Sequence, residues 1–211
     1  MNSSVHDLQK VLEFCFAEQV KATALWHESE PRQPGRPSGC TLQGFPDLVM
    51  RDHYFNFQLW HVEDEARRKD VDDSVIAGCK RSIDALNQQR NDSIEEVDRC
   101  ICDLLLPLLP EDALARQNTE TAGMAMDRLS ILALKIYHME EQASRTDAGQ
   151  EHIRSCEKKL SILRLQREGL IKALVELVAD YAEGRKSPVL YSQFKMYNDP
   201  SLNPQLYGNK K

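Results

Sequence analysis

Residues 73–106 read DSVIAGCKRSIDALNQQRNDSIEEVDRCICDLLL, and this stretch decides the fold class. Its apolar residues recur at intervals of three and four, which places them on one face of a helix. They are Ile76, Cys79, Ile83, Leu86, Ile94, Val97 and Ile101. Pro107 and Pro110 follow, and proline ends a helix because it lacks the backbone N–H. The stretch is therefore predicted to be one long amphipathic helix.

The same periodicity extends to both sides of this helix. It predicts helices over about 4–28, over about 47–69, from near Thr121 to a break at 146–149, and from there to a C-terminal cap at Gly184. The stretch 29–46 holds four of the nine prolines and is predicted to be a loop. We expect an all-α, antiparallel helical bundle of about five helices, formed as a single helical domain over residues 1–211.

The C-terminal residues 185–211 differ in character from the helices. They carry three tyrosines, one phenylalanine and three prolines. This composition is too aromatic for a disordered tail. We expect an extended arm whose aromatic residues pack on the bundle.

Charge and hydropathy exclude several classes of protein. The formal net charge is −6 and the sequence pI is about 5.6, whereas nucleic-acid binding needs an accumulated basic surface. No apolar run approaches the roughly 18 residues that span a bilayer. The first residues lack the basic start and apolar centre of a signal peptide. We therefore expect a cytoplasmic protein with no nucleic-acid partner and no membrane span.

The six cysteines do not suggest a disulfide framework. Cys15, Cys79, Cys100 and Cys156 fall on or near apolar helical stripes, where a free cysteine behaves as a small hydrophobic residue. There is no C-x-x-C pair that would indicate a zinc or redox site. We expect free thiols in the core.

Two arginines interrupt apolar seams. Arg90 stands between Leu86 and Ile94, and Arg167 stands between Leu163 and Leu170. A buried guanidinium costs several kcal/mol unless it is paired. Each arginine is therefore expected to meet a carboxylate across the core or to line a cavity that holds an anion.

Polar residues at helical spacing predict a pocket between the second, third and fourth helices. The second helix carries His53, Asn56, Trp60, Glu63, Asp64 and Arg67, the third carries Asp84, Asn87, Asn91, Glu95 and Asp98, and the fourth carries Asp127, Arg128, Lys135 and His138. Arginine would grip an anion in a planar fork, and asparagine would bind hydroxyls. From these helices and the fifth we select as ligand-binding candidates Asn56, Trp60, Glu63, Asp64, Arg67, Asp84, Asn87, Arg90, Asn91, Arg128 and Arg167. The alternative interpretation is a set of solvated faces and structural ion pairs.

Motifs for familiar chemistry are missing from the sequence. No histidine has a glutamate three residues before it, and HExxH, Walker, GxGxxG and GxSxG patterns are absent. A Mg²⁺ site of Glu63, Asp64 and Asp98 is only weakly indicated, so we expect neither a metal nor another cofactor. Gly123 near the start of the fourth helix indicates either an anion site or a tight helix contact.

Three blocks of sequence resemble a known family. They are NFQLWHVEDEARRKDVDDSVIAGCKRSIDALNQQRNDSIEEVD, ETAGMAMDRLSILALKIYHM and QFKMYNDPSLNPQLYG. Together they cover roughly residues 53–207 and resemble the bacterial family called domain of unknown function 4254. The resemblance implies an all-helical fold without an established activity, and it suggests a place in cell-envelope glycan assembly.

Three hypotheses for function follow from these observations. The first is a binding or accessory protein whose polar pocket takes an anionic metabolite, such as a nucleotide sugar or phosphosugar, or contacts a partner enzyme or a second copy of the chain. The second is a helical enzyme, either a Mg²⁺-dependent phosphate-ester hydrolase or a catalyst similar to chorismate mutase. The third is a purely structural bundle.

Overall fold

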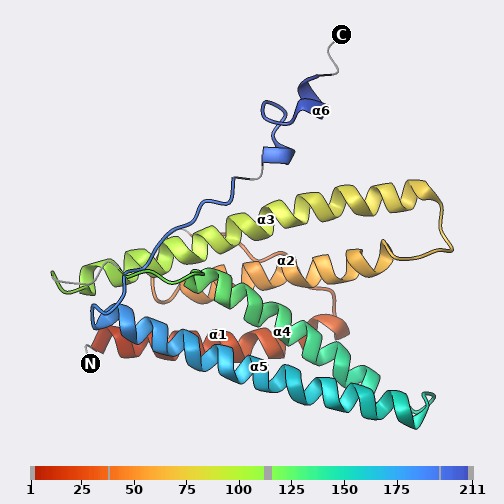
Figure 1. Ribbon diagram of the computed structural model, residues 1–211, viewed down its shortest axis with the longest axis horizontal. Helices are drawn as coiled ribbons and strands as arrows, with labels where there is room; N and C mark the ends of the chain where they lie inside the picture. The colour runs from red at the N-terminus through yellow and green to blue at the C-terminus, as the bar shows by residue number, and fades with distance from the viewer. Residues whose placement is uncertain (1–2, 38, 112–115, 195, 209–211) are drawn as a thin grey trace.

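Five long helices make up most of the computed structural model, which describes residues 3–37, 39–111, 116–194 and 196–208 (Figure 1). They are α1 (Ser3–Glu28), α2 (Phe45–Glu65), α3 (Asp73–Leu105), α4 (Ala122–Ala143) and α5 (Gln150–Ala182). Short helical turns are η1 (Leu106–Leu108), η2 (Met196–Asn198) and α6 (Pro204–Tyr207). These described ranges contain no strand, and the predicted all-α bundle is confirmed.

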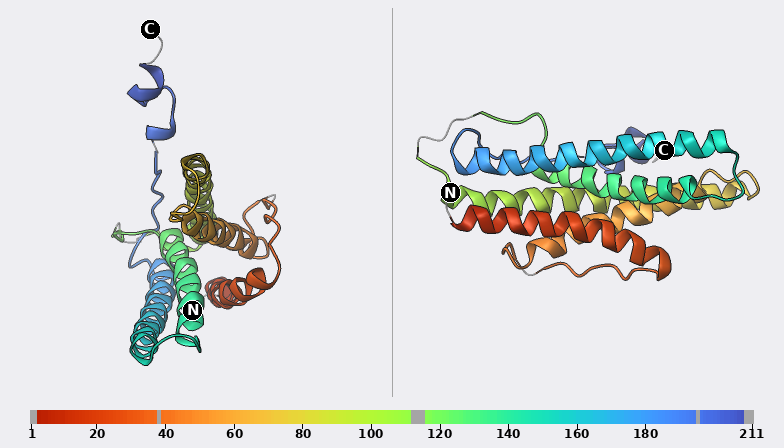
Figure 2. Two further views of the ribbon diagram at one scale, coloured as in Figure 1. Left: turned by 90° about the vertical axis from the view of Figure 1, so that its right-hand side faces the viewer. Right: turned by 90° about the horizontal axis from the view of Figure 1, so that it is seen from below.

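The direction of each helix follows from the length of its connection. The short links 66–72 and 144–149 join antiparallel neighbours, α2 to α3 and α4 to α5. The loop 29–44 instead returns along the bundle, so α1 and α2 run in the same direction (Figures 1 and 2). Such a loop can span about 50 Å, more than the roughly 32 Å length of α2. As a result α1, α2 and α4 all end at the same end of the bundle.

Helix α4 is the central element, because it packs against each of the other four long helices. Its residues Met126, Leu129 and Leu134 are almost completely buried. Around them lies a core to which all five long helices contribute. Among the described residues no helix is both long and apolar enough to cross a lipid bilayer. Because α4 is surrounded by the other helices, its polar residues that face the core need hydrogen-bond partners within the protein.

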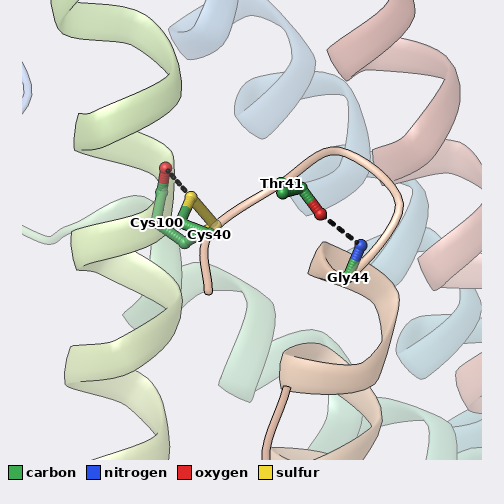
Figure 3. The surroundings of a disulfide bond; sticks show 4 residues. All are labelled: Cys40, Thr41, Gly44 and Cys100. Carbon is green, nitrogen blue, oxygen red and sulfur yellow. Dashed lines mark hydrogen bonds between the residues drawn. A yellow bond between two sulfur atoms is a disulfide. The ribbon is translucent and has the colours of Figure 1, made fainter. Parts of the chain in front are cut away.

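The loop 29–44 is fastened to α3. Figure 3 shows a disulfide between Cys40 of the loop and Cys100 of α3, whose Cα atoms are 5.1 Å apart. Next to it, the Gly44 N–H donates to Thr41 Oγ1 at 3.0 Å, just before α2 begins. The expectation that all cysteines are free thiols is therefore wrong for this pair. The helical pattern of Cys100 indicated burial, but it could not show that a loop residue lies across that face of α3.

A second tight junction joins α3 to the start of α4. Asp98 of α3 accepts the Gly123 N–H at 2.6 Å and the Thr121 hydroxyl at 2.5 Å. Burial raises the pKa of Asp98 to about 6, and these two hydrogen bonds act against that rise. The carboxyl group of the protein itself thus takes the place of the anion that helix N-termini attract. The sequence left either an anion site or a tight helix contact at Gly123, and the structure shows the tight contact.

The C-terminal arm is extended, as expected, but two of the three aromatic side chains that the structure describes in it do not pack on the bundle. Its first part is attached: the Gln193 N–H donates to Glu95 at 2.8 Å, and the Ser187 N–H donates to the Arg116 carbonyl at 2.9 Å. Beyond that Asn198 Nδ2 still donates to Gln88 Oε1 of α3 at 3.4 Å, and the chain then projects away from the helices (Figures 1 and 2). Phe194 is 83% exposed and Tyr207 is 51% exposed. The expected docking is therefore wrong for both. The expectation for the side chain of Tyr197 lies outside the described residues.

Truncation should separate the two parts of the arm. We expect a chain that ends at Gln193 to keep its melting temperature within about 2 °C, because the removed apolar residues are exposed. A chain that ends at Gly184 should melt several degrees lower, since it also loses the contacts to Glu95 and to the Arg116 carbonyl. Differential scanning calorimetry of both chains makes the comparison. A large loss for the chain ending at Gln193 would contradict the observed exposure.

Candidate functional site

A pocket of about 300 Å³ opens between α2, α3 and α4. Its walls carry aromatic, amide, guanidinium and carboxylate groups together with three aliphatic side chains. The lining residues are Asn56, Leu59, Trp60, Glu63, Asp64, Arg67, Asn87, Arg90, Ile131 and Leu134. The structure therefore brings together Asn56, Trp60, Glu63, Asp64, Arg67, Asn87 and Arg90 from the candidates chosen by sequence.

Helix α2 supplies one wall because its polar residues recur on one face. Asn56, Trp60, Glu63 and Asp64 are separated by intervals of four, three and one, so they follow a single stripe from the core to the end of the helix. Asn56 is buried, Trp60 and Glu63 are half-buried, and Asp64 is exposed. The stripe thus leads from a dry floor to a solvated mouth.

The floor of the pocket is held by an ion pair between α3 and α4. Arg90 Nε donates to Asp127 Oδ1 at 2.6 Å, and Arg90 Nη2 donates to Asp127 Oδ2 at 2.5 Å. The side chains of Arg90 and Asp127 are 24% and 9% exposed. Two parallel bonds of this kind fix both orientation and distance. The expectation that Arg90 meets a carboxylate is confirmed.

A directed chain of hydrogen bonds continues from this floor into the core. Asn56 Nδ2 donates to Asp127 at 2.8 Å and to the Ser130 hydroxyl at 3.0 Å. Ser130 Oγ lies 2.8 Å from His53 Nδ1, and His53 Nε2 lies 3.1 Å from Thr23 Oγ1.

The partners at the two ends of this chain determine the tautomer of His53. The Thr23 hydroxyl donates to the Gln19 carbonyl at 2.8 Å, so its oxygen is left to accept from His53 Nε2–H. His53 Nδ1 must then accept from Ser130. Burial lowers the pKa of His53 to about 3, which keeps the ring neutral as this arrangement requires. The floor is thereby braced by four helices, α1 to α4.

Asp52 is a second carboxyl group beneath the floor. It is buried, and its Oδ2 lies 3.4 Å from Asn56 Nδ2. Burial, with repulsion from Asp127, raises the pKa of Asp52 well above its usual range. The positive charge of Arg90 acts against that rise, because it favours the ionised form of Asp52.

The mouth of the pocket holds a second guanidinium that is easily released. Arg67 follows the end of α2 and donates to Glu63 Oε2 at 2.8 Å. Its side chain is 68% exposed, and exposed pairs of this kind contribute only about 0.3–0.5 kcal/mol. Arg67 can leave Glu63 at little cost, whereas Arg90 cannot leave Asp127. Arg67 is thus the cation that can accept an anionic group from outside.

The remaining candidates lie elsewhere, for reasons of helical geometry. Arg128 follows Asp127 by one residue, which turns its side chain about 100° away, and it pairs with Glu120 at 2.5 Å. Asn91 is turned from Arg90 in the same way and is buried. Asp84 forms an ion pair with Lys80 on the surface of α3. None of these three candidates lines the pocket.

Arg167 also lies outside the pocket, and its predicted carboxylate partner is wrong. Its Nη2 donates to the backbone carbonyl of Phe16 at 2.5 Å. Burial lowers the pKa of Arg167. The seam pattern correctly predicted a partly buried arginine on α5, but the partner is a backbone carbonyl of α1, which no side-chain pattern reveals.

Several residues of the site were not selected from the sequence. Asp127 and His53 were recognised as polar residues of their helices, but not as parts of one network. Asp52 and Ser130 gave no signal, because a single polar residue in a helix usually faces solvent. Three histidines that gather beside Trp60, namely His27, His61 and His138, come from different helices and form no motif.

The fold and the pocket together define a class of protein: an all-α bundle with a polar pocket braced by a buried hydrogen-bond network. Comparison with protein families then places it more closely. The family described as "Protein of unknown function (DUF4254)" matches residues 46–189, and the chain belongs to this family. Neither the curated proteins nor the solved structures gave a match.

Proposed function

We propose that the chain is a binding or accessory protein whose pocket between α2, α3 and α4 takes a monosaccharide phosphate. The observation that carries this proposal is the meeting of Trp60, Asn87, Asp64 and the displaceable Arg67 around one opening. An aromatic ring beside hydrogen-bonding amide and carboxylate groups suits a compact ligand with many hydroxyls. Arg67 adds one site for a phosphate.

The charge balance of the pocket sets the number of phosphates. Arg90 is neutralised by Asp127, and Glu63 and Asp64 add two carboxylates near the mouth. Only Arg67 can be recruited, by giving up an exposed pair with Glu63. One guanidinium matches one phosphate in a bidentate contact. The pyrophosphate of a nucleotide sugar would meet too little positive charge here.

The size of the pocket agrees with a small ligand. Its volume of about 300 Å³ stands at the lower end of the range for ligand pockets, roughly 300–1,000 Å³. This favours a phosphosugar over a nucleotide sugar. A phosphosugar ligand would suit a role in glycan assembly, which remains part of the proposal.

Two competing functions receive less support. The Mg²⁺ site needs Asp98 beside Glu63 and Asp64, but Asp98 binds the start of α4 with both of its oxygens. A purely structural bundle would explain the pairs Arg67–Glu63 and Arg90–Asp127. It gives no reason for an open pocket above a braced polar floor.

A protein partner or a second copy of the chain is the second candidate, and the projecting arm favours it. The arm exposes apolar side chains: Leu190, Phe194, Met196, Leu202, Leu206 and Tyr207. Exposed apolar groups on one segment mark interaction sites. Light scattering of the full chain and of the chain ending at Gln193 would show whether this arm holds an assembly together. Equal masses that both correspond to one chain would exclude self-association through the arm.

We place the protein in the cytoplasm as part of the same proposal. Four buried cysteines are free thiols: Cys15, Cys79, Cys102 and Cys156. The Cys40–Cys100 disulfide counts against this location, because disulfides are rare in reducing compartments. If the pair is reduced there, the Cys40 sulfur lies 3.1 Å from the Cys100 carbonyl, where a thiol can donate. Mass spectrometry after rapid alkylation in cells would settle the state of this pair. Complete oxidation there would argue for an oxidising compartment.

Titration calorimetry with a panel of hexose phosphates and the corresponding free hexoses tests the ligand. For a hexose phosphate that binds, Arg67→Ala should weaken binding by roughly 10- to 100-fold, because a charged hydrogen bond contributes about 1.5–3 kcal/mol. Binding of the free sugar should not change. Asn87→Ala should weaken both ligands.

The matched control is Arg128→Ala, an exposed arginine on α4 that lies outside the pocket. It should leave both affinities unchanged. Failure of every hexose phosphate to bind would overturn the proposal. An equal loss of affinity in Arg67→Ala and Arg128→Ala would also overturn it, because that result describes a general charge effect.

A further inference from the structure

Three histidines from three helices converge at one end of the bundle. His27 lies in the last turn of α1, His61 lies one turn before the end of α2, and His138 lies near the end of α4. One ring nitrogen from each can be chosen so that all three lie within 4.8 Å of one another. The cluster forms because α1, α2 and α4 run in the same direction and end together.

Two of these rings are oriented with one nitrogen left open. His27 Nδ1 lies 2.6 Å from the Thr23 carbonyl, which can only accept, so Nδ1 carries the proton. His138 Nδ1 lies 2.8 Å from a carboxylate oxygen of Glu141 and donates in the same way. The Nε2 atoms of both rings are buried and have no hydrogen-bond partner among the described residues. In the neutral tautomer with the proton on Nδ1, each Nε2 carries a lone pair that is buried and receives no hydrogen bond.

The third ring, His61, faces solvent. Burial lowers its pKa, and the nearby imidazoles of His27 and His138 lower it further. A neutral imidazole at this position offers a nitrogen lone pair for coordination. It is also the ring through which an ion could enter from solvent.

We propose that His27, His61 and His138 bind one Zn²⁺ ion through their imidazole nitrogens. Four-coordinate zinc with Zn–N distances of 2.0–2.1 Å holds its ligand atoms about 3.3 Å apart. The present limit of 4.8 Å is close enough for small rotations of the rings to reach that spacing. Zinc would give the two open Nε2 atoms the partner that they lack.

The surroundings of the cluster match the environment of metal sites. Histidines that bind metals donate their other N–H to a carbonyl or a carboxylate, as His27 and His138 do here. Apolar rings restrict the ligands: Tyr137 stacks on His27 at 4.1 Å and Trp60 stacks on His138 at 4.7 Å between ring centroids. The helix C-termini add a favourable potential for a cation, strongest at His27 in the last turn.

The ligand set also indicates the class of metal. Three neutral imidazoles suit Zn²⁺ and other late first-row ions, whereas Mg²⁺ and Ca²⁺ prefer oxygen ligands. Three protein ligands leave a fourth position for water or a substrate group. Because His61 is exposed, this position would be open to solvent.

An aromatic cluster without a metal is the competing explanation. Phe57 contacts His27 and His61 edge-on, so the rings do pack as apolar groups. Packing alone would be served equally well by phenylalanine, and it does not explain two buried nitrogens without donors. The orientation of both Nδ1–H groups toward acceptors is needed for metal binding but not for packing.

Zinc binding by the full-length protein, free of any polyhistidine tag and stripped with a chelator, tests the proposal. Competition against a chromophoric zinc chelator should give one Zn²⁺ per chain. His61→Ala and His138→Ala should each lower the affinity by at least about 100-fold, since loss of a supporting group alone costs 10- to 100-fold. Glu141→Ala removes only the hydrogen-bond acceptor of His138, and it should lower the zinc affinity by 10- to 100-fold.

His6→Ala is the matched control, because His6 is an exposed histidine of α1 outside the cluster. It should bind zinc as the wild type does. Co²⁺ substitution gives an independent readout: the visible absorption of tetrahedral cobalt should appear in the wild type and in His6→Ala but not in His61→Ala. Because His61 is exposed, this variant should fold even where His138→Ala does not.

Two results would overturn the zinc proposal. One is the absence of stoichiometric zinc binding and of the cobalt spectrum in the wild type. The other is a zinc affinity of His61→Ala that equals the affinity of the wild type. The experiment contains no sugar, so its outcome is independent of the proposed phosphosugar site.

Discussion

Gly123→Ala is expected to lower the free energy of unfolding by about 3 kcal/mol, the upper part of the range for overpacking. A Cβ at this position would lie 2.8 Å from the Ile94 carbonyl oxygen and 2.8 Å from the Asp98 carboxyl group. The Ile94 carbonyl belongs to the backbone of α3 and cannot rotate away. The methyl group would therefore push α4 off α3 and break the hydrogen bond from the Gly123 N–H to Asp98. Urea unfolding followed by circular dichroism measures the loss.

Gly78→Ala supplies a control of opposite sign. Gly78 lies within α3, and an added Cβ there would meet nothing within 4 Å. This substitution should stabilise the protein by about 0.5–1 kcal/mol through helix propensity alone. Equal effects of the two substitutions would show that the α3–α4 junction is looser than the structure has it.

Arg90→Met is expected to cost about 3 kcal/mol, because it leaves the Asp127 carboxylate nearly buried without its ion-pair partner. Asp127 would then face Asp52 across Asn56, and Asn56 would be its remaining donor among the hydrogen bonds described. The cost is placed at the lower end of the range for broken buried pairs, because the Arg90 side chain is 24% exposed. Urea unfolding at pH 7 measures the difference.

A second substitution distinguishes a stranded charge from lost packing. In the Arg90→Met/Asp127→Leu double variant both charges are gone, so much of the lost stability should return. The exposed pair Arg145–Asp147 serves as the control, and Arg145→Ala should leave the free energy of unfolding almost unchanged. A double variant less stable than Arg90→Met would contradict the role given to Asp127.

The helices could be predicted from the sequence because their signals are local. The expected start of the third helix at Asp73 agrees with α3, and the expected start of the fourth helix near Thr121 agrees with α4, which begins at Ala122. The Thr121 hydroxyl accepts the Met124 N–H at this helix start. Prolines and glycines in 29–46 marked the loop correctly. Each of these features depends on residues within one or two helical turns.

The candidate site could be predicted only in part, because its geometry depends on how the helices face each other. Asn56, Trp60 and Asn87 were placed together by helical stripes. Arg128 was chosen, whereas its neighbour Asp127 is the residue that pairs with Arg90 at the floor of the pocket. Periodicity fixes the spacing of residues on a helix but not the rotation of the helix in the bundle. The disulfide between Cys40 and Cys100 and the three-histidine cluster both join residues far apart in the chain. Neither forms a recognisable spacing.

The pocket and the histidine cluster share one residue. Trp60 lines the pocket and also stacks on His138 at 4.7 Å between ring centroids. A change in the position of this indole would alter both the shape of the pocket and the ring contact with His138. The ring therefore offers a probe for the pocket that is already built into the protein.

The most direct test of the proposed function is to observe Trp60 while a hexose phosphate is added. The chain has only two tryptophans, so a nitrogen-15 correlation spectrum shows two indole N–H signals. Trp26 stacks on the buried His53 and does not line the pocket, and its signal is the internal control. If the pocket binds the phosphosugar, the Trp60 signal should shift in a saturable manner while the Trp26 signal stays in place, and Arg67→Ala should require a much higher concentration for the same shift. A Trp60 signal that does not move at millimolar phosphosugar would contradict the account.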